Sequence, residues 1–234
     1  ARDLIRRKLA SDARPWVDKI AKIDPSSPVC AELQARLAVL EKNPDAAVTI
    51  LRELIRKNPP QLAIVAALLE DLRLYPAAEE MFRRVAEEPG QPANLLVLAE
   101  YLGRHGKTRD ALDLCDKAWS TVPPANVAAS SVAILFSSDI GMPDCNRVAA
   151  RFEAALKTAP ADAAMNFYLA NVRILQGRYA EAEAIFRDAF ERNKAGSALL
   201  NNLAWLLSLQ DGKSSQALET VNQAITIGGA VPEY

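Results

Sequence analysis

The sequence predicts an all-α protein, an α-solenoid of antiparallel helix pairs with about 12 to 14 helices. Two observations lead to this prediction. Helix-forming residues such as Ala, Leu, Glu and Arg are abundant, and the alternating β-branched runs typical of strands are missing. Apolar residues also recur at helical spacing, in a register that repeats along the chain.

The second helix of each pair is marked by a triplet of apolar residues. A small residue is followed by a large one four positions later and by a third apolar residue seven positions later. This spacing places all three side chains on one face of a helix, which predicts a buried stripe. The first members lie 31 to 37 residues apart and are Ala13, Ala47, Ala78, Ala111, Val148, Ala182 and Ala217.

The first helix of each pair carries a small residue 12 or 13 positions before the triplet. Short polar segments such as HGKT (105–108) and QGRY (176–179) join the two helices. Proline tends to follow the second helix, because it cannot donate the next helical hydrogen bond. The small first-helix residues are Ala35, Ala66, Ala99, Ala170 and Ala204, with Phe136 in the same place in one repeat.

This pattern resembles the tetratricopeptide repeat family over almost the whole chain. The segment YLANVRILQGRYAEAEAIFRDAF (168–190) is similar to the family motif at nearly every defining position. The segment NNLAWLLS (201–208) resembles the first helix of bacterial members. The resemblance implies a right-handed superhelix, with a concave groove that binds protein segments.

We expect a single solenoid domain over residues 1–234, because stacked repeats share one continuous core. In the repeat 129–162, Phe136 and Val148 replace alanine, so we expect the helices to be pushed apart there. The chain starts within a repeat and ends on GGAVPEY (228–234), so we expect it to be part of a longer protein. The expected parts are a half repeat 1–27 and repeats 28–58, 59–91, 92–128, 129–162, 163–196 and 197–230.

Charge and composition argue against several classes of partner. The net charge is −1 and no dense basic stripe is present, which argues against nucleic acid. No apolar stretch is long enough to span a bilayer, so we expect no membrane insertion. The three cysteines, Cys30, Cys115 and Cys145, include no C-x-x-C pair, which argues against disulfides and zinc and favours a reducing, cytoplasmic compartment.

The sequence predicts no enzyme activity, cofactor or metal. GRHGKT (103–108) ends like a phosphate-binding loop, but Tyr101 replaces the first glycine and a helix precedes it. His105 is the only histidine, which excludes a multi-histidine metal site. We therefore expect Gly106 to serve an interhelical turn, and the cysteines to be packing residues.

The resemblance implies that first-helix residues line the groove. In peptide-binding members, asparagines placed like Asn171 and Asn202 hold the ligand's main chain, since an amide both donates and accepts. Phe167 stands where co-chaperone members have lysine, so a carboxylate clamp is not expected. Asn201 lies about 100° away from Asn202 around the helix and is left out. The predicted groove residues are Phe167, Asn171, Asn202 and Trp205, with Glu100 and Arg104 in an earlier repeat.

Two structural alternatives stay open at these positions. Asn202 could hydrogen-bond a neighbouring helix, and Trp205 could be wedged between repeats, as we expect for Trp16 and Trp119. The function predicted is a non-catalytic scaffold that binds a peptide or helix of a partner protein. The alternatives are a regulatory or recruiting arm of a larger enzyme, and a module that associates with itself.

Overall fold

The computed structural model describes residues 1–137, 140–192 and 196–229. Every regular element in these ranges is a helix, so the predicted all-α class and its helix pairs are confirmed. The chain divides into two compact units, Ala1–Tyr101 (unit 1) and Leu102–Tyr234 (unit 2), each described below by itself. The expectation of one continuous domain stays a prediction.

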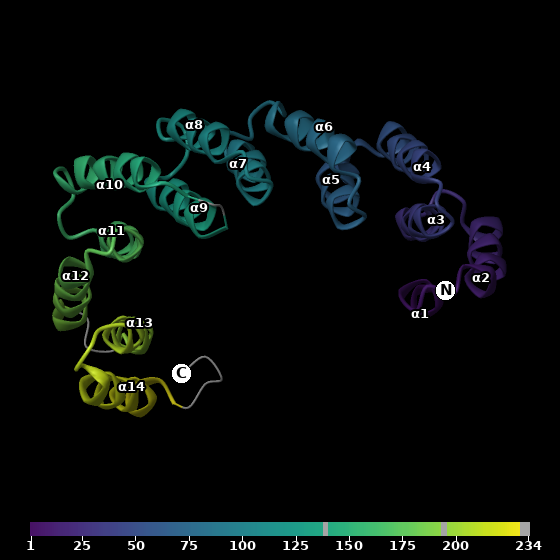
Figure 1. The fold of residues 1–234 in the computed structure, drawn as a ribbon. Coiled ribbons are helices and arrows are strands. Elements are labelled where there is room, and N and C mark those ends of the chain that lie inside the picture. The colour runs from purple at the N-terminus through teal and green to yellow at the C-terminus, as the bar shows by residue number, and fades with distance from the viewer. Residues whose placement is uncertain (138–139, 193–195, 230–234) are drawn as a thin grey trace. The chain divides into compact units, whose positions relative to one another are not determined.

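Unit 1 is a series of helix pairs. In Figure 1, α1, α3 and α5 lie along one side of the unit, and α2, α4 and α6 lie along the other. The helix α7 begins in unit 1 and ends in unit 2. The elements are α1 (Arg2–Arg6), α2 (Ala10–Ile23), α3 (Pro28–Leu40), α4 (Pro44–Lys57), the 3-10 turn η1 (Pro59–Gln61), α5 (Leu62–Asp71), α6 (Tyr75–Ala86) and α7 (Asn94–Arg104).

Unit 2 continues the same plan. In Figure 1, α9, α11 and α13 lie along one side and α10 and α12 along the other, with α14 next to α13. The elements are α8 (Thr108–Ala118), α9 (Pro124–Ser137), α10 (Met142–Leu156), α11 (Ala163–Leu175), α12 (Tyr179–Arg192), α13 (Ser197–Ser208) and α14 (Ser214–Gly228). The segment GGAVPEY (228–234) lies mostly outside the described residues.

The predicted apolar stripes form the core. The small first members of the triplets are buried in every repeat, and so are the large second members, apart from half-buried Val221. The small first-helix residues are buried as well, which lets the paired helices approach closely. The alanines with no exposed surface at all are Ala13, Ala35, Ala47, Ala66, Ala78, Ala99, Ala111, Ala118, Ala128, Ala170, Ala182 and Ala224.

A residue with positive φ recurs at the turn between the two helices of a pair. In unit 2 this residue is a glycine, such as Gly177 with φ of 71°, whereas in unit 1 it is a lysine or arginine, such as Arg73 with φ of 59°. At all of these turns except the one with Gly212, the next residue donates its N–H to a carbonyl five positions back, as Arg178 does to Arg173 at 2.8 Å, and this closes the first helix. The positions are Lys8, Lys42, Arg73, Gly106, Gly177 and Gly212.

The repeat 129–162 differs from the others in the exposure of Phe136, while the displacement of its helices by bulky residues stays a prediction. Phe136 is 52% exposed, whereas the alanines in its place in other repeats are buried. The helices α9 and α10 pack less closely than the pairs α3/α4, α5/α6, α11/α12 and α13/α14. The half-exposed ring of Phe136 therefore does not fill a close contact between helices, contrary to the place that the sequence pattern gave it. Part of the long connection SSDIGMPDC (137–145) lies outside the described residues.

The two tryptophans assigned to packing differ. Trp119 is half-buried and stacks on Phe152, with ring centroids 6.1 Å apart. Trp16 is 55% exposed, and the Lys19 ammonium lies 5.9 Å from its ring centroid, so the packing assignment is wrong there. The physical reason is helical position, since Trp16 lies about 100° around α2 from the buried Val17.

We predict that Gly177→Ala destabilises the protein by about 1 kcal/mol, because a side chain at positive φ strains the backbone. An added Cβ would meet nothing within 4 Å, so crowding does not contribute. The reverse change, Arg73→Gly, should leave stability unchanged or raise it by about 0.5 kcal/mol. Urea unfolding of both variants is the measurement, and equal destabilisation by both would contradict the explanation.

Candidate functional site

The helix α13 carries two of the predicted groove residues on an otherwise buried element. Leu200, Leu203 and Leu207 form its packed side. Trp205 is 49% exposed and Asn202 is half-buried, so neither is enclosed between helices. Burial of the leucines holds α13 in place, which leaves the indole at the surface of a rigid support.

The side-chain amide of Asn202 forms no hydrogen bond with any residue that the structure describes. The alternative that Asn202 bonds to a neighbouring helix therefore finds no support in these contacts. An amide that is half-buried and unpaired keeps both its donors and its acceptor for another molecule.

The helix α11 carries the other two predicted groove residues. Asn171 is half-buried, and its Nδ2 donates to the Phe167 carbonyl oxygen at 2.9 Å, one helical turn back. The Phe167 ring packs against the core, with its centroid 6.1 Å from that of Phe186. Phe167 is thus mainly a packing residue, while Asn171 keeps its carbonyl oxygen as an acceptor.

A shared core joins α11 and α13 through α12. Ala170 and Ile174 of α11, Phe186 of α12, and Leu203 and Leu206 of α13 belong to one buried cluster. Asn171 directly follows Ala170, and Asn202 directly precedes Leu203, so both amides flank this buried contact. We call Phe167, Asn171, Asn202 and Trp205 the α11–α13 face.

An ion pair fixes the segment that follows α13. Lys213, just before α14, donates to the Glu183 carboxylate of α12 at 2.6 Å, and Arg187 binds the other oxygen at 2.9 Å. Burial by itself raises the pKa of Glu183, but the hydrogen bonds from Lys213 and Arg187 outweigh it and hold the pKa below its usual value. The carboxylate therefore stays ionised at neutral pH and ties α14 to α12 around α13.

The other two predicted groove residues, Glu100 and Arg104, are on the helix α7. Glu100 is half-buried and belongs to unit 1, whereas Arg104 is exposed and belongs to unit 2. Both side chains already take part in interactions. They are therefore not assigned to the α11–α13 face, and their role in a groove stays a prediction.

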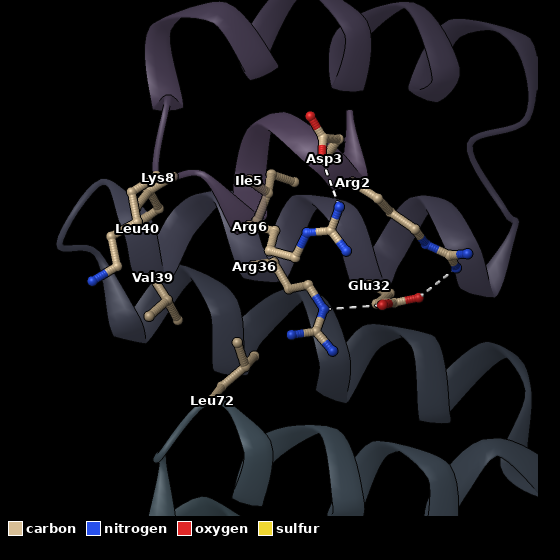
Figure 2. Close-up of a pocket in the computed structure, with 10 residues that line it drawn as sticks. All are labelled: Arg2, Asp3, Ile5, Arg6, Lys8, Glu32, Arg36, Val39, Leu40 and Leu72. Atoms are coloured by element: carbon tan, nitrogen blue, oxygen red, sulfur yellow. Dashed lines mark hydrogen bonds and ion pairs between the residues drawn. The ribbon is translucent and has the colours of Figure 1, made fainter.

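A groove in unit 1 was not anticipated from the sequence. Its volume is about 690 Å³, and it lies between α1, α3 and the residue that follows α5, as Figure 2 shows. Basic side chains and half-buried apolar ones share its walls. The lining residues are Arg2, Asp3, Ile5, Arg6, Lys8, Glu32, Arg36, Val39, Leu40 and Leu72.

The carboxylates of this groove are paired with its arginines. Glu32 accepts hydrogen bonds from Arg2 and Arg36, each at 2.9 Å, and Asp3 accepts one from Arg6 at 2.6 Å. Burial by itself raises the pKa of Glu32, but the two arginines outweigh it and lower the pKa. The signal in the sequence was RDLIRRK (2–8), which mixes basic and apolar residues, but it falls in a half repeat with no groove position assigned.

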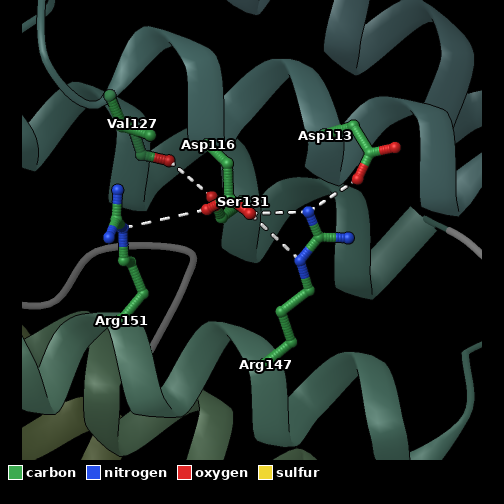
Figure 3. A network of polar contacts seen from close by, with 6 residues as sticks. All are labelled: Asp113, Asp116, Val127, Ser131, Arg147 and Arg151. Carbon is green, nitrogen blue, oxygen red and sulfur yellow. Dashed lines mark hydrogen bonds and ion pairs between the residues drawn. The ribbon is translucent and has the colours of Figure 1, made fainter.

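Unit 2 contains a cluster of aspartates and arginines on α8 and α10. Arg147 of α10 binds Asp113 and Asp116 of α8, each at 2.6 Å, and Arg151 lies 3.8 Å from Asp116, as Figure 3 shows. Burial by itself lowers the pKa of Arg147, but these aspartates outweigh it and raise the pKa. Because the charges neutralise each other, the cluster links α8 to α10 and leaves no group poised for catalysis.

Arg173 forms a second structural link. Its side chain is 5% exposed, and it pairs with Glu153 of α10 and with Glu181 of α12, the latter at 3.3 Å. It also donates to Gln176 at 2.7 Å. A buried guanidinium needs such partners, so Arg173 ties three helices together around α11.

Comparison with known proteins agrees with this architecture. Residues 146–198 match the tetratricopeptide repeat family model, a range that spans α11, α12 and most of α10. This match identifies residues 146–198 as tetratricopeptide repeat sequence. Repeats of this family are generally non-catalytic scaffolds for protein–protein interaction. A search of the curated proteins found no match.

Solved structures of tetratricopeptide repeat proteins and assemblies are similar to the chain. A thermophilic repeat protein of Thermus thermophilus, TTC0263, has 22% identity and a TM-score of 0.49, over 72% of this chain and 91% of that one. A MamA RS-1 double mutant has 15% identity and a TM-score of 0.43, over 84% and 93%. The hetero-tetramer Cut9–Hcn1 of APC/C has 11% identity and a TM-score of 0.45, over 98% and 45%.

The residues considered for chemistry in this repeat protein are structural in their surroundings. Gly106 has φ of 75° in the turn between α7 and α8, so GRHGKT is an interhelical turn. Burial raises the pKa of the Cys30 and Cys145 thiols, with smaller contributions from Asp24 and Asp144, which disfavours the reactive thiolate.

Searches for metal and membrane sites were limited to the described residues. Within these ranges, no group of three or more His, Cys, Asp or Glu side chains is arranged to hold a metal ion. In the same part of the chain, no helix has both the length and the hydrophobicity that crossing a lipid bilayer requires.

We predict that Arg147→Met lowers stability by about 1 kcal/mol, because Asp113 and Asp116 lose their partner at a half-exposed site. Amide hydrogen exchange should accelerate in α10 more than in α12, since α10 packs loosely on α9. The matched control is Arg109→Met, an exposed arginine of α8 without an ion pair in the described structure. Equal hydrogen-exchange rates in α10 for Arg147→Met and Arg109→Met would show that the ion pairs of Arg147 do not stabilise α10.

We predict that Glu183→Gln lowers stability at pH 7 by about 1 kcal/mol. The folded-state pKa of Glu183 is lowered, so its stabilisation is complete above about pH 4.5 and is lost as pH falls through the folded pKa. The difference between wild type and variant should therefore shrink between pH 7 and pH 3 in urea unfolding. The control is Glu219→Gln, at an exposed position of α14. A stability difference between wild type and Glu183→Gln that does not change with pH would contradict this account.

Proposed function

We propose that this tetratricopeptide repeat protein is a non-catalytic scaffold that binds an extended segment of a partner protein on the α11–α13 face. The observation that carries the proposal is the half-exposed Trp205 beside the unpaired amide of Asn202. An exposed indole on a rigid helix offers a large apolar contact at little entropic cost, and tryptophan is enriched among the residues that dominate binding energies.

The amides favour an extended ligand over a helical one. An extended peptide presents unpaired N–H and C=O groups, whereas the backbone groups of a helix are already bonded to each other. Asn202 offers donors and an acceptor, and Asn171 offers its Oδ1 because its Nδ2 is bonded to Phe167. Together they suit a main chain that needs hydrogen bonds of both kinds.

Self-association is a second candidate that one observation favours. Leu218 and Ile227 of α14 are 63% and 43% exposed, and Leu209 near the end of α13 is 47% exposed. Exposed apolar side chains of this size are candidates for an interface between copies. Light scattering at increasing protein concentration distinguishes a stable oligomer from a monomer.

We predict that Trp205→Ala and Asn202→Ala each weaken binding of peptides selected from a random linear library. The expected loss is about tenfold for Trp205→Ala and about fivefold for Asn202→Ala, with melting temperatures within about 3 °C of wild type. Isothermal titration calorimetry and thermal unfolding are the measurements.

Matched controls are available in the chain. Trp16→Ala removes an indole of similar exposure from α2, and Asn222→Ala removes an exposed amide from α14. Neither should change the affinity for the selected peptides. A variant Asn202→Ala that unfolds earlier while binding normally would show that the amide is structural, and would remove it from the proposed site.

A further inference from the structure

The groove of unit 1 has room for a ligand and is separate in its residues from the α11–α13 face. Its volume of about 690 Å³ falls within the range typical of ligand-binding clefts. The helix α1 forms one wall, α3 forms another, and Leu72 lies at one end (Figure 2). All three elements belong to unit 1, so the groove is defined within one compact part of the chain.

The floor of the groove is apolar and incompletely covered. Ile5 of α1, Val39 and Leu40 of α3, and Leu72 after α5 are each half-buried. Aromatic side chains are absent from this lining, so the groove offers no stacking platform for a nucleic-acid base. The floor is suited instead to an aliphatic side chain of a ligand.

The rim carries an excess of positive charge. The lining has four cationic side chains against the two carboxylates of Asp3 and Glu32. Counting the ion-pair partners just outside the lining, Arg7 and Asp71, leaves the surplus of two unchanged. Since the whole chain has a net charge of −1, this excess is a local feature.

The two carboxylates of the groove are already neutralised by its arginines. Glu32 is bound by Arg2 and Arg36, and Asp3 is bound by Arg6. Lys8 forms no ion pair with any described residue, and its side chain is exposed at the rim. The attraction left for a ligand is therefore for anionic groups.

Lys8 also occupies a backbone position that favours glycine. Its φ is 63°, and the equivalent turns of unit 2 have Gly106, Gly177 and Gly212. The turn is held by hydrogen bonds from the Lys8 and Leu9 amides to the carbonyls of Ile5 and Leu4, each at 2.9 Å. Lys42 and Arg73 have the same conformation at the equivalent turns of unit 1, so the turn is a repeated structural feature, and it holds Lys8 at the edge of the groove.

We propose that the groove of unit 1 binds an internal acidic segment of a partner protein, in which an aliphatic side chain is flanked by aspartate or glutamate. The aliphatic side chain occupies the floor formed by Ile5, Val39, Leu40 and Leu72. The flanking carboxylates lie at the rim, where Lys8, Arg6 and Arg2 attract them. This function goes beyond peptide binding on the α11–α13 face and uses none of its residues.

The test uses the whole chain and fluorescently labelled peptides with blocked ends. One set alternates Leu with Asp and Glu, a second replaces Asp and Glu with Lys, and a third replaces Leu with Ser. We expect only the first set to bind, with an affinity about tenfold lower at 0.5 M than at 0.05 M salt, since screening weakens the rim charges. Fluorescence anisotropy gives the dissociation constants.

Single substitutions test whether the acidic peptides bind at the groove of unit 1. Lys8→Glu should weaken binding of the peptides that alternate Leu with Asp and Glu by about tenfold. Lys22→Glu, at an exposed position of α2, should change this binding less than twofold. Lys22 is the matched control, because it is also an exposed lysine without an ion pair in the described structure. Trp205→Ala should leave this binding unchanged, which separates it from the function proposed for the α11–α13 face.

Three outcomes would overturn the proposal. One is failure of every acidic peptide to bind, and another is equal binding by the serine-substituted set, since the floor would then have no role. The third is equal loss in Lys8→Glu and Lys22→Glu. Binding of single-stranded RNA with the same Lys8 dependence, without binding of acidic peptides, would instead assign the groove to nucleic acid.

Discussion

The close approach of paired helices at buried alanines is the constraint on which the rest of the structure depends. Ala47, Ala78 and Ala182 have no exposed surface, and each lies at the contact between a second helix and its partner. The small side chain sets the distance between helices, and this distance lets the larger side chains interdigitate. In the repeat 129–162, Phe136 is exposed, and α9 and α10 pack less closely than the pairs α3/α4, α5/α6, α11/α12 and α13/α14.

Ion pairs compensate where this packing is weak. Arg147 links α10 to α8 through Asp113 and Asp116, and the buried Arg173 ties α10, α11 and α12 together. In these links, opposite charges lie next to one another and connect neighbouring helices, although the buried Nε of Arg173 has no hydrogen-bond partner among the described residues. The charges of the unit 1 groove differ, because Lys8 remains without a partner among the described residues.

Because each helix uses one stripe for packing, its other face is left for binding. On α13 the leucines are buried and Trp205 is half-exposed, so helical periodicity itself separates support from contact surface. The resemblance to the repeat family led to Asn202 and Trp205 as predicted groove residues, and their role stays a prediction. The sequence could not show that the Phe167 ring packs against the core or that Asn171 bonds to its own helix, because both depend on contacts after folding.

The sequence by itself determined the all-α class, the helix pairs and their turns, because all of these follow from local spacing and residue size. The sequence did not reveal the groove of unit 1, whose walls come from α1, α3 and the residue after α5. Its basic and apolar lining forms only where the residues of RDLIRRK (2–8) pack near Glu32 and Leu72. Only the tertiary structure decided which amides and cations stay unpaired, since pairing depends on neighbours that are distant in sequence. The exposure of Trp16, contrary to expectation, has the same cause.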